Sequence, residues 1–502
     1  HMDLRSKLAL YKSTVSSKNS GSIINDGANN DAFPENACDT ISIQEPSNDL
    51  CEGLEGKLYK NKYGSYYMIE KRYLLSDSYG CYCFKEALEI EPSLIYKISN
   101  FTEYRDYGRT SSFSKNNGFI QCNLLEQFEY NGTSSDRDEK PVFEDLTGNM
   151  AEHMLFIDTE TTGLSYGTGT IAFLIGLGYF EKDSFILKQF FLRDYDEETA
   201  VLYEISSIIK NYKFIVSFNG KSYDWNILQS RFAFNRLNAS LDGFVHIDLL
   251  YPSRRIWKLK LENCRLASIE ENILGEARTD DIPGAMIPAV YFKYLEDRNT
   301  SDIKRVIEHN RRDILCMVSL LVRICRMLKN PLAETDGCTE LLGVGTIFET
   351  HALLEKKQLH REQEKLNEIY GGRICIKENI TESSNAQMLI DCFTGCTKSQ
   401  NSHVRESASK KLAEYYKKNG MYKEAVEQWK AMLQSNTSLK LYPMLELAKY
   451  YEHRAKDIPK AIEIVEQAMK ETGKLGYRNN IYLDDLKKRL ERLRRKIEKK
   501  SI

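Results

Sequence analysis

Two carboxylates, Asp158 and Glu160, follow directly after the apolar run Met154–Ile157 in the stretch FIDTETTGL. In a β-strand, residues two apart point to the same side of the sheet, so these carboxylates would lie side by side and repel one another. A divalent cation turns this repulsion into binding, because hard oxygen ligands suit Mg²⁺ or Mn²⁺. The pair therefore indicates a metal site, and a surface turn with two solvated acids is the alternative.

Two later segments carry further candidate side chains on helices. In FIVSFNGKSYDWNILQSRF, a strand and a tight turn precede a helix that we expect Ser222 to cap, which puts Asp224 in the first helical turn. Ligands of open α/β sheets bind near this end of a strand. In IKRVIEHNRRDILCMVSLL, His309 and Asp313 lie four apart and share one helix face. Taken singly, a helix-dipole role explains Asp224 equally well, and an i, i+4 His–Asp pair is more often a surface ion pair than a catalytic one.

The elements around these residues predict an α/β domain at residues 151–330. Apolar strands come first, at Met154–Ile157, Ile171–Phe180, Phe185–Phe191 and Phe214–Phe218. Short turns join the first three, so we expect an antiparallel meander, followed by a helical crossover to a strand parallel to the first. This mixed sheet with flanking helices is the order of a ribonuclease-H-like fold.

The remainder of the chain divides into three further regions. Residues 1–55 are rich in Ser, Asn, Gly and Asp, and we expect them to be disordered. Residues 56–150 predict a small β-rich N-terminal unit followed by a loose connector. Residues 335–502 predict an all-α domain, in which a repeat of about 35 residues is close to the tetratricopeptide period. Its basic C-terminal helix is expected to cap the repeats.

Composition limits the function classes. Lys and Arg number 70 against 72 Asp and Glu, so any nucleic-acid binding must depend on local patches of charge. The 12 cysteines have no zinc-ribbon spacing, and no apolar run is long enough to span a membrane. We expect a cytoplasmic protein with no membrane partner.

Together, the three acidic segments resemble the motifs of the DEDD exonuclease superfamily, which includes polymerase proofreading domains and ribonuclease D. The segments FIDTETTGL, FNGKSYDW, HIDLLYPSRRIWK, TDDIPG and HNRRD resemble more closely the bacterial YprB-type proteins, which join such a domain to tetratricopeptide repeats. The resemblance runs from about Glu152 to the C-terminus. It leaves residues 1–150 without an interpretation.

The resemblance implies a set of roles for the site. Asp158, Glu160, Asp224 and Asp313 would bind two divalent cations, Mg²⁺ or Mn²⁺. His309 would act as general base. The interval from His309 to Asp313 is four residues, the spacing of the superfamily's tyrosine branch, whereas its histidine branch usually has five.

Substrate contacts are predicted around two loops and one basic segment. Related enzymes bind the terminal nucleotide just after the first motif, while an Arg/Lys cluster around a tryptophan can neutralise phosphates and stack a base. An ordinary turn and a solvated basic loop are the alternatives. The predicted contacts are Thr161, Thr162, Gly163, Leu164, Asn219, Lys221, Arg254, Arg255, Trp257 and Lys258.

These patterns favour a metal-dependent 3′→5′ exonuclease that hydrolyses DNA to nucleoside 5′-monophosphates in DNA repair. Polarity, DNA preference and repair are implied by the resemblance alone. One alternative is an RNA 3′→5′ exonuclease, since no residue in view reads a 2′-hydroxyl. Another is an inactive adapter that recruits partners through its repeats. The tetratricopeptide region would bind a protein partner, and a repair helicase is one candidate.

Overall fold

The computed structural model describes residues 53–99, 148–163, 169–237, 244–370, 384–435, 440–474 and 480–498. Nearly all of the segment predicted to be disordered, and most of the predicted connector, lie outside these ranges. The chain divides into two compact units. The first runs to Pro252 and resumes at Asn263–Cys325, and the second comprises Ser253–Glu262 and Arg326–Ile502.

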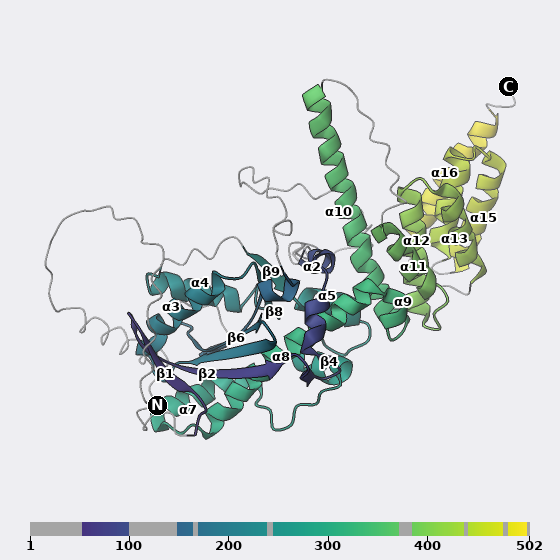
Figure 1. Ribbon diagram of the computed structural model, residues 1–502. Helices are drawn as coiled ribbons and strands as arrows, with labels where there is room; N and C mark the ends of the chain where they lie inside the picture. The colour runs from purple at the N-terminus through teal and green to yellow at the C-terminus, as the bar shows by residue number, and fades with distance from the viewer. Residues whose placement is uncertain are drawn as a thin grey trace. The chain divides into compact units, whose positions relative to one another are not determined.

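A seven-stranded mixed sheet forms the centre of the first unit (Figure 1). Its strands, in spatial order, are β1 (Lys57–Asn61), β2 (Gly64–Leu74), β7 (Ser184–Phe191), β6 (Ala172–Glu181), β5 (Met154–Thr161), β8 (Phe214–Ser217) and β9 (Val245–Asp248). The pairs from β1 to β5 are antiparallel, and β8 and β9 run parallel to β5. The predicted meander and parallel crossover are confirmed.

The predicted β-rich N-terminal segment contributes strands to this same sheet. Strand β2 pairs antiparallel with β7 over eight residue pairs, from Tyr67↔Phe191 to Leu74↔Ser184. Tyr66, Tyr67, Met68 and Ile69 are buried in the main hydrophobic core of the unit. The alternation of aromatic and polar residues predicted strands correctly, but these strands extend the central sheet instead of forming a unit of their own.

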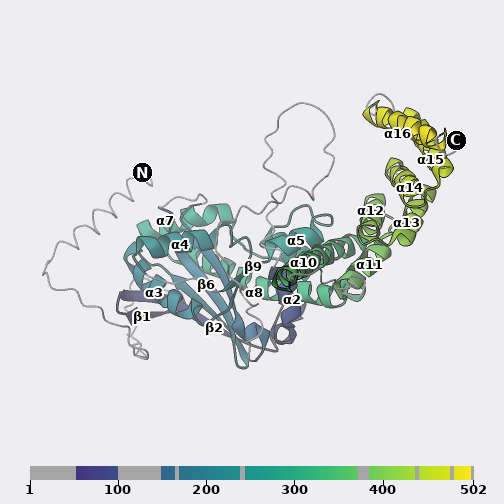
Figure 2. The same ribbon diagram turned by 90° about the horizontal axis from the view of Figure 1, so that it is seen from above.

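Helices cover both faces of the sheet. Helices α3 (Glu198–Ile209) and α4 (Asp224–Phe234) lie on one face, and α7 (Ile287–Asp297) and α8 (Ser301–Lys329) on the other (Figure 1). Figure 2 shows α3 and α4 lying over the strands when the sheet is seen from above. The core consists of large apolar side chains from both strands and helices, such as Phe173, which stacks on Tyr291 of α7.

Short elements complete the first unit. They are β3 (Ser78–Tyr79), β4 (Tyr82–Cys83), η1 (Phe84–Glu89), α2 (Pro92–Ser99), η3 (Met150–His153), η4 (Tyr195–Glu197), α6 (Leu266–Ile269), η5 (Glu270–Leu274) and η6 (Gly284–Met286). Helix α5 (Leu250–Trp257) begins in the first unit, and its residues from Ser253 onward belong to the second.

The second unit is helical. Its helices are α9 (Pro331–Glu334), α10 (Cys338–Tyr370), α11 (Ser384–Cys396), α12 (Ser402–Lys418), α13 (Tyr422–Gln434), α14 (Leu441–His453), α15 (Ile458–Lys474) and α16 (Asn480–Glu498). The predicted helical region is confirmed, and helices α11 to α16 follow one another in chain order (Figure 2). The repeat unit corresponds to the pairs α12/α13 and α14/α15, and their assignment as tetratricopeptide repeats stays a prediction.

Helix α16 packs against α15 as the sequence predicted for a capping helix. Its Leu486 and Leu493 are buried in the core of the unit. The carboxylate of Glu452 on α14, fully buried, accepts hydrogen bonds from Arg489 at 2.7 Å, Arg492 at 2.9 Å and Lys496 at 2.8 Å. Three basic residues of α16 thus bind this helix to a buried acid of α14.

Among the described residues, no helix combines the length and the apolar character needed to cross a membrane.

Candidate metal centre

Strand β5 presents Asp158 and Glu160 to the face of the sheet that α8 covers. Asp158 lies opposite Gly176 of β6, and directly opposed residues point to the same face. A Cβ atom at position 176 would lie 2.3 Å from Oδ1 of Asn310, a side chain of α8. Gly176 therefore lets α8 approach the sheet closely enough to place its polar residues beside the two acids.

Two buried amide side chains, Asn310 and Gln189, hold Asp158 in place. Nδ2 of Asn310 donates to Oδ2 of Asp158 at 2.7 Å and to its backbone carbonyl at 3.2 Å. Gln189 of β7 in turn donates to Oδ1 of Asn310 and to the carbonyl of Ile307, both at 2.8 Å. Both amide side chains are fully buried. Because a buried donor is costly to leave unpaired, this chain of amides fixes the orientation of Asp158.

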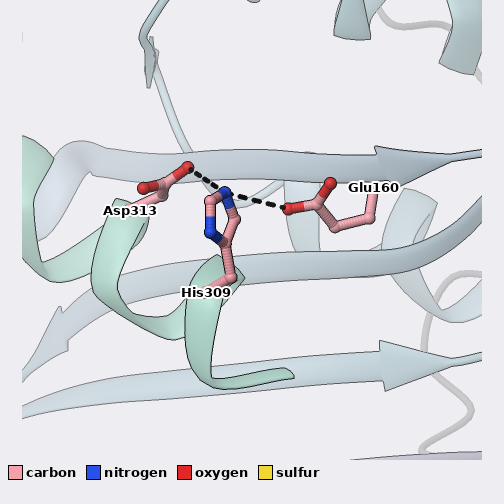
Figure 3. A group of neighbouring side chains, drawn as sticks. All are labelled: Glu160, His309 and Asp313. Atoms are coloured by element: carbon pink, nitrogen blue, oxygen red, sulfur yellow. Dashed lines mark ion pairs between the residues drawn. The ribbon is translucent and has the colours of Figure 1, made fainter. Parts of the chain in front are cut away.

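Helix α8 brings His309 and Asp313 to Glu160. Nε2 of His309 lies 3.9 Å from Oε1 of Glu160 and 3.6 Å from Oδ2 of Asp313. Figure 3 shows the His309 ring between the two carboxylates, with Glu160 on the strand and the other two residues on the helix. One ligand atom from each of the three residues lies within 4.8 Å of the others, a spacing compatible with a shared metal ion.

The other side of the His309 ring faces Asp281, which lies in the segment before α7. Nδ1 of His309 is 2.7 Å from Oδ1 of Asp281. Burial by itself would raise the pKa of Asp281, but the hydrogen bond and charge of His309 and the charge of Arg278 outweigh it, so the pKa is lowered. Asp281 is therefore an ionised acceptor for the imidazole.

Arg278 places a buried positive charge next to these groups. Its guanidinium donates to Asp313 and to the fully buried Glu270, and it also contacts Asp281 at 3.3 Å. Oδ1 of Asp313 accepts this hydrogen bond, while Oδ2 is the atom nearer to His309. Arg278 thus orients Asp313 with one oxygen toward the space between His309 and Glu160.

Asp224 is buried in the first turn of α4, as predicted. The residue before the helix is Tyr223, not the predicted Ser222, and no side chain caps the helix. The hydroxyl of Thr159 on β5 donates to Asp224. Burial, followed by repulsion from Asp248 and Asp313, raises the pKa of Asp224 to about 6.

The carboxylates act on one another electrostatically. Burial is the main cause that raises the pKa of Asp158 well above its usual value, and the charges of Asp313 and Asp224 add to it. Glu160 shows the same pattern, with Asp158 as its strongest neighbour. Buried acids that raise one another's pKa need a cation to stay ionised together. Hard carboxylate oxygens with one imidazole fit a divalent metal ion, so the donor set suits the cofactor predicted from the sequence.

The turn after β5 uses the polar side chains that were predicted to contact substrate. The hydroxyl of Thr161 donates to the carbonyl of Gly163 at 2.8 Å, and that of Thr162 accepts from the amide of Ile171 at 3.0 Å. Both threonines are buried. These contacts favour the ordinary-turn alternative for the two hydroxyls, and Leu164 lies outside the described residues.

The loop before α4 is fixed by Asp248 at the end of β9. Its carboxylate accepts from the amides of Asn219 at 2.8 Å, Lys221 at 3.2 Å and Leu250 at 3.1 Å. Asn219 has a positive φ of 66°, a conformation that Asn tolerates better than most residues. The backbone amides of Asn219 and Lys221 thus stabilise the loop, and phosphate contacts from their side chains stay a prediction.

Trp257 does not have the predicted base-stacking role. Its side chain is fully buried, and its Nε1 donates to Oε1 of Glu340 on α10 at 3.0 Å. Both of these residues belong to the second unit. Arg254, Arg255 and Lys258 around it are exposed, and phosphate binding by them stays a prediction.

Arg278, Asp281 and Asn310 were not among the site residues predicted from the sequence. Asn310 is adjacent to His309 in the HNRRD segment, and Asp281 is part of the TDDIPG segment, so both were in view without a role. Arg278 lies 35 residues from Asp313, and no local pattern connects the two.

Comparison with known proteins agrees with this architecture. Residues 155–325 match the family described as the RNase_H superfamily, and this stretch is a ribonuclease-H-like domain, a class whose members are usually nucleases. The protein named "Uncharacterized protein YprB" of Bacillus subtilis (strain 168) is 29% identical over 351 residues, which are 70% of this chain and 76% of that protein.

Among solved structures, the chain is similar to the family B DNA polymerase from the hyperthermophilic archaeon Pyrobaculum calidifontis. The likeness has a TM-score of 0.28 and 15% identity and covers 41% of this chain. It spans 30% of the polymerase chain, well under half of its length.

Proposed function

We propose that this protein is a metal-dependent 3′→5′ exonuclease that hydrolyses DNA, with a role in DNA repair. The observation that carries the proposal is the group of Glu160, His309 and Asp313 in a ribonuclease-H-like domain, whose ligand atoms lie within 4.8 Å of one another. The buried Asp158 and Asp224 raise the negative charge around this group. Repulsion among these acids is costly unless cations are bound. The 3′→5′ polarity, the preference for DNA and the link to repair are supported by the motif resemblance.

Each acid has a defined part in this proposal. Asp158, fixed by Asn310, would bind two Mg²⁺ or Mn²⁺ ions, Glu160 and Asp313 would complete one ion's ligands, and Asp224 would bind the other. Two such ions supply an activated water and stabilise the leaving 3′ oxygen. His309 turns Nε2 toward this space, and a general-base role for it was the prediction from sequence.

The experiment uses the purified full-length chain with Mg²⁺ or Mn²⁺ and matched single- and double-stranded DNA and RNA labelled at either end. We expect mononucleotides released from the 3′ end of DNA, and no products in EDTA. Faster hydrolysis of RNA would favour the RNA exonuclease. Absence of cleavage on every substrate with both metals would favour the inactive adapter.

Matched variants separate the site from a contaminating nuclease. Asp158→Asn should abolish product formation, since it removes the carboxylate that both ions would share. Asp183→Asn, an exposed acid in the β6–β7 turn, should cleave like the wild type. Equal activity in all three proteins would show that the cleavage does not come from this site.

We also propose that the second unit binds a protein partner through its repeats, a repair helicase being the candidate class. Stacked helix pairs form concave surfaces suited to protein segments. Affinity measured between the isolated partner and the full chain, compared with cleavage by the same preparation, tests this division of roles.

A further inference from the structure

The position of Nε2 of His309 permits a role other than the general base expected from sequence. Nε2 is 3.9 Å from the Glu160 oxygen and 3.6 Å from the Asp313 oxygen, and the three residues' ligand atoms lie within 4.8 Å of one another. Three atoms at these separations have a common point about 2.0–2.4 Å from each, the length of a metal–ligand bond. We propose that His309 binds the ion directly through Nε2, beside Glu160 and Asp313, and that Asp281 is its positioning residue.

The two possible roles of His309 require different positions of the ion. A base acting on a water needs that water between itself and the ion, at about 2.6–3.2 Å from the base, which would put Nε2 roughly 4 Å from the ion. An ion that lies on the His309 side of Glu160 and Asp313, at the point common to the three ligand atoms, would instead be at bonding distance from Nε2, with no room for a water between them. A lone pair that binds the ion is also not available to accept a proton.

The Asp281 contact supplies the second part of the inference. Nδ1 lies 2.7 Å from the Asp281 carboxylate, which can only accept, and 3.4 Å from Nη1 of Arg278. The shorter contact favours the tautomer that carries its proton on Nδ1 and leaves Nε2 unprotonated. Metal-binding histidines usually donate their other ring N–H to a carboxylate or carbonyl in this way. Arg278 contacts Asp281 and Asp313 together, so one cation orients both the positioning acid and the ligand acid.

This donor set affects which ion binds. Mg²⁺ prefers carboxylate, carbonyl and water oxygens, whereas imidazole suits later first-row metals and is accepted by Mn²⁺ and Co²⁺. We therefore expect the site that includes His309 to bind Mn²⁺ and Co²⁺ more tightly than Mg²⁺. The inference deepens the proposed function, since it concerns the same acids, but its readout is metal binding and not hydrolysis.

The test is electron paramagnetic resonance of Mn²⁺ bound to the full-length protein, without nucleic acid. We expect a spin-echo modulation from a directly bound nitrogen, which changes to the ¹⁵N pattern when the chain carries ¹⁵N-labelled histidine. The labelling experiment needs no substitution, so it stands even if a variant fails to fold. Stoichiometric Mn²⁺ binding without a histidine nitrogen signal would overturn the inference.

Three variants extend the test. His309→Ala should remove the nitrogen signal and weaken Mn²⁺ binding more than tenfold, and Asp281→Ala should weaken it by roughly 10–100-fold, the usual effect of losing such a partner. The control is His360→Ala. His360 forms an exposed i, i+4 pair with Glu364 on α10, the same spacing as His309 with Asp313, and its loss should change nothing. Retention of the signal in His309→Ala would refute the assignment.

The outcomes also separate this inference from the proposed function. A nitrogen signal in a protein that cleaves no substrate would support the metal ligand and count against the exonuclease. Metal-dependent 3′→5′ cleavage without the signal would support the exonuclease, and His309 would then return to the role of general base.

Discussion

Asp224→Asn provides a quantitative test of the electrostatics of the site. Burial and neighbouring acids raise the pKa of Asp224 from 3.8 to about 6. Each pKa unit corresponds to about 1.36 kcal/mol, so ionised Asp224 costs the metal-free protein about 3 kcal/mol at pH 7. Asn removes this cost and retains an oxygen that can accept from the Thr159 hydroxyl. The variant should therefore be more stable than the wild type in EDTA.

The raised pKa of Asp224 determines how the stability difference between the variant and the wild type changes with pH. A carboxyl whose folded pKa is raised contributes its full stability below the unfolded pKa of 3.8, and that contribution is lost as pH rises through about 6. The difference between variant and wild type should thus be near zero at pH 3.5 and reach its maximum above pH 7. Because a domain of this size shifts its unfolding temperature by about 2–4 °C per kcal/mol, the predicted gain is roughly 6–12 °C.

The assay must report on the first unit alone. Urea-dependent hydrogen exchange of peptides from β5 and α4 does so, since it follows the local opening of these elements. Asp183→Asn is the matched control and should change the free energy of unfolding by less than about 0.5 kcal/mol. An Asp224→Asn protein that is no more stable than wild type at pH 7 in EDTA, with β5 and α4 intact, would refute the calculation. Saturating Mn²⁺ should narrow the difference, because the wild type gains more from binding.

Three further predictions concern other parts of the molecule. Asn310→Ala should lower the free energy of unfolding by about 1.5–3 kcal/mol, because Asp158 loses a charge-assisted hydrogen bond, and urea denaturation would measure this loss. It should also lower turnover, which steady-state kinetics would detect. Gly176→Ala should destabilise the first unit, because its Cβ would meet Asn310 at 2.3 Å; unchanged urea denaturation would contradict this close packing. Glu452→Gln should speed hydrogen exchange in α16, because the three basic side chains of that helix lose their charged partner. Burial opposes the ionisation of Glu452, but Lys496, Arg492 and His453 outweigh it and lower its pKa from 4.5 to about 2. In the wild type, the stability that ionised Glu452 gives to α16 is therefore fully present above pH 4.5 and should be lost as pH falls through about 2.

The strands and the acids that end them were predictable because their signals are local. Apolar runs separated by short turns define β5, β6 and β7, and an acid in the first turn of a helix marks Asp224. The i, i+4 spacing put His309 and Asp313 on one face of α8. These features depend on residues only a few positions apart, and helical and strand periodicities report them directly.

The features that sequence reasoning missed depend on distant pairs. The stretch around Tyr67 reads as a strand, but nothing in it indicates that its neighbour is Phe191. Trp257 lies among basic residues and suggests an exposed stacking platform, whereas its partner, Glu340, lies 83 residues further on. The pairing of Asp281 with His309 spans 28 residues. Burial and polar partnering at such separations are set by tertiary packing, which periodicity does not encode.

The position of Trp257 along the chain also affects folding during synthesis. Trp257 and Ile256 belong to the second unit, yet the chain returns to the first unit at Asn263–Cys325 before the rest of the second is made. A ribosome that adds about 5–20 residues per second reaches Glu340 roughly 4–17 s after Trp257. During this interval the indole of Trp257 lacks α10, the helix whose Glu340 it contacts in the folded protein. The nascent first unit must therefore pack α7 and α8 on its sheet while the segment around Trp257 still lacks its partner helix.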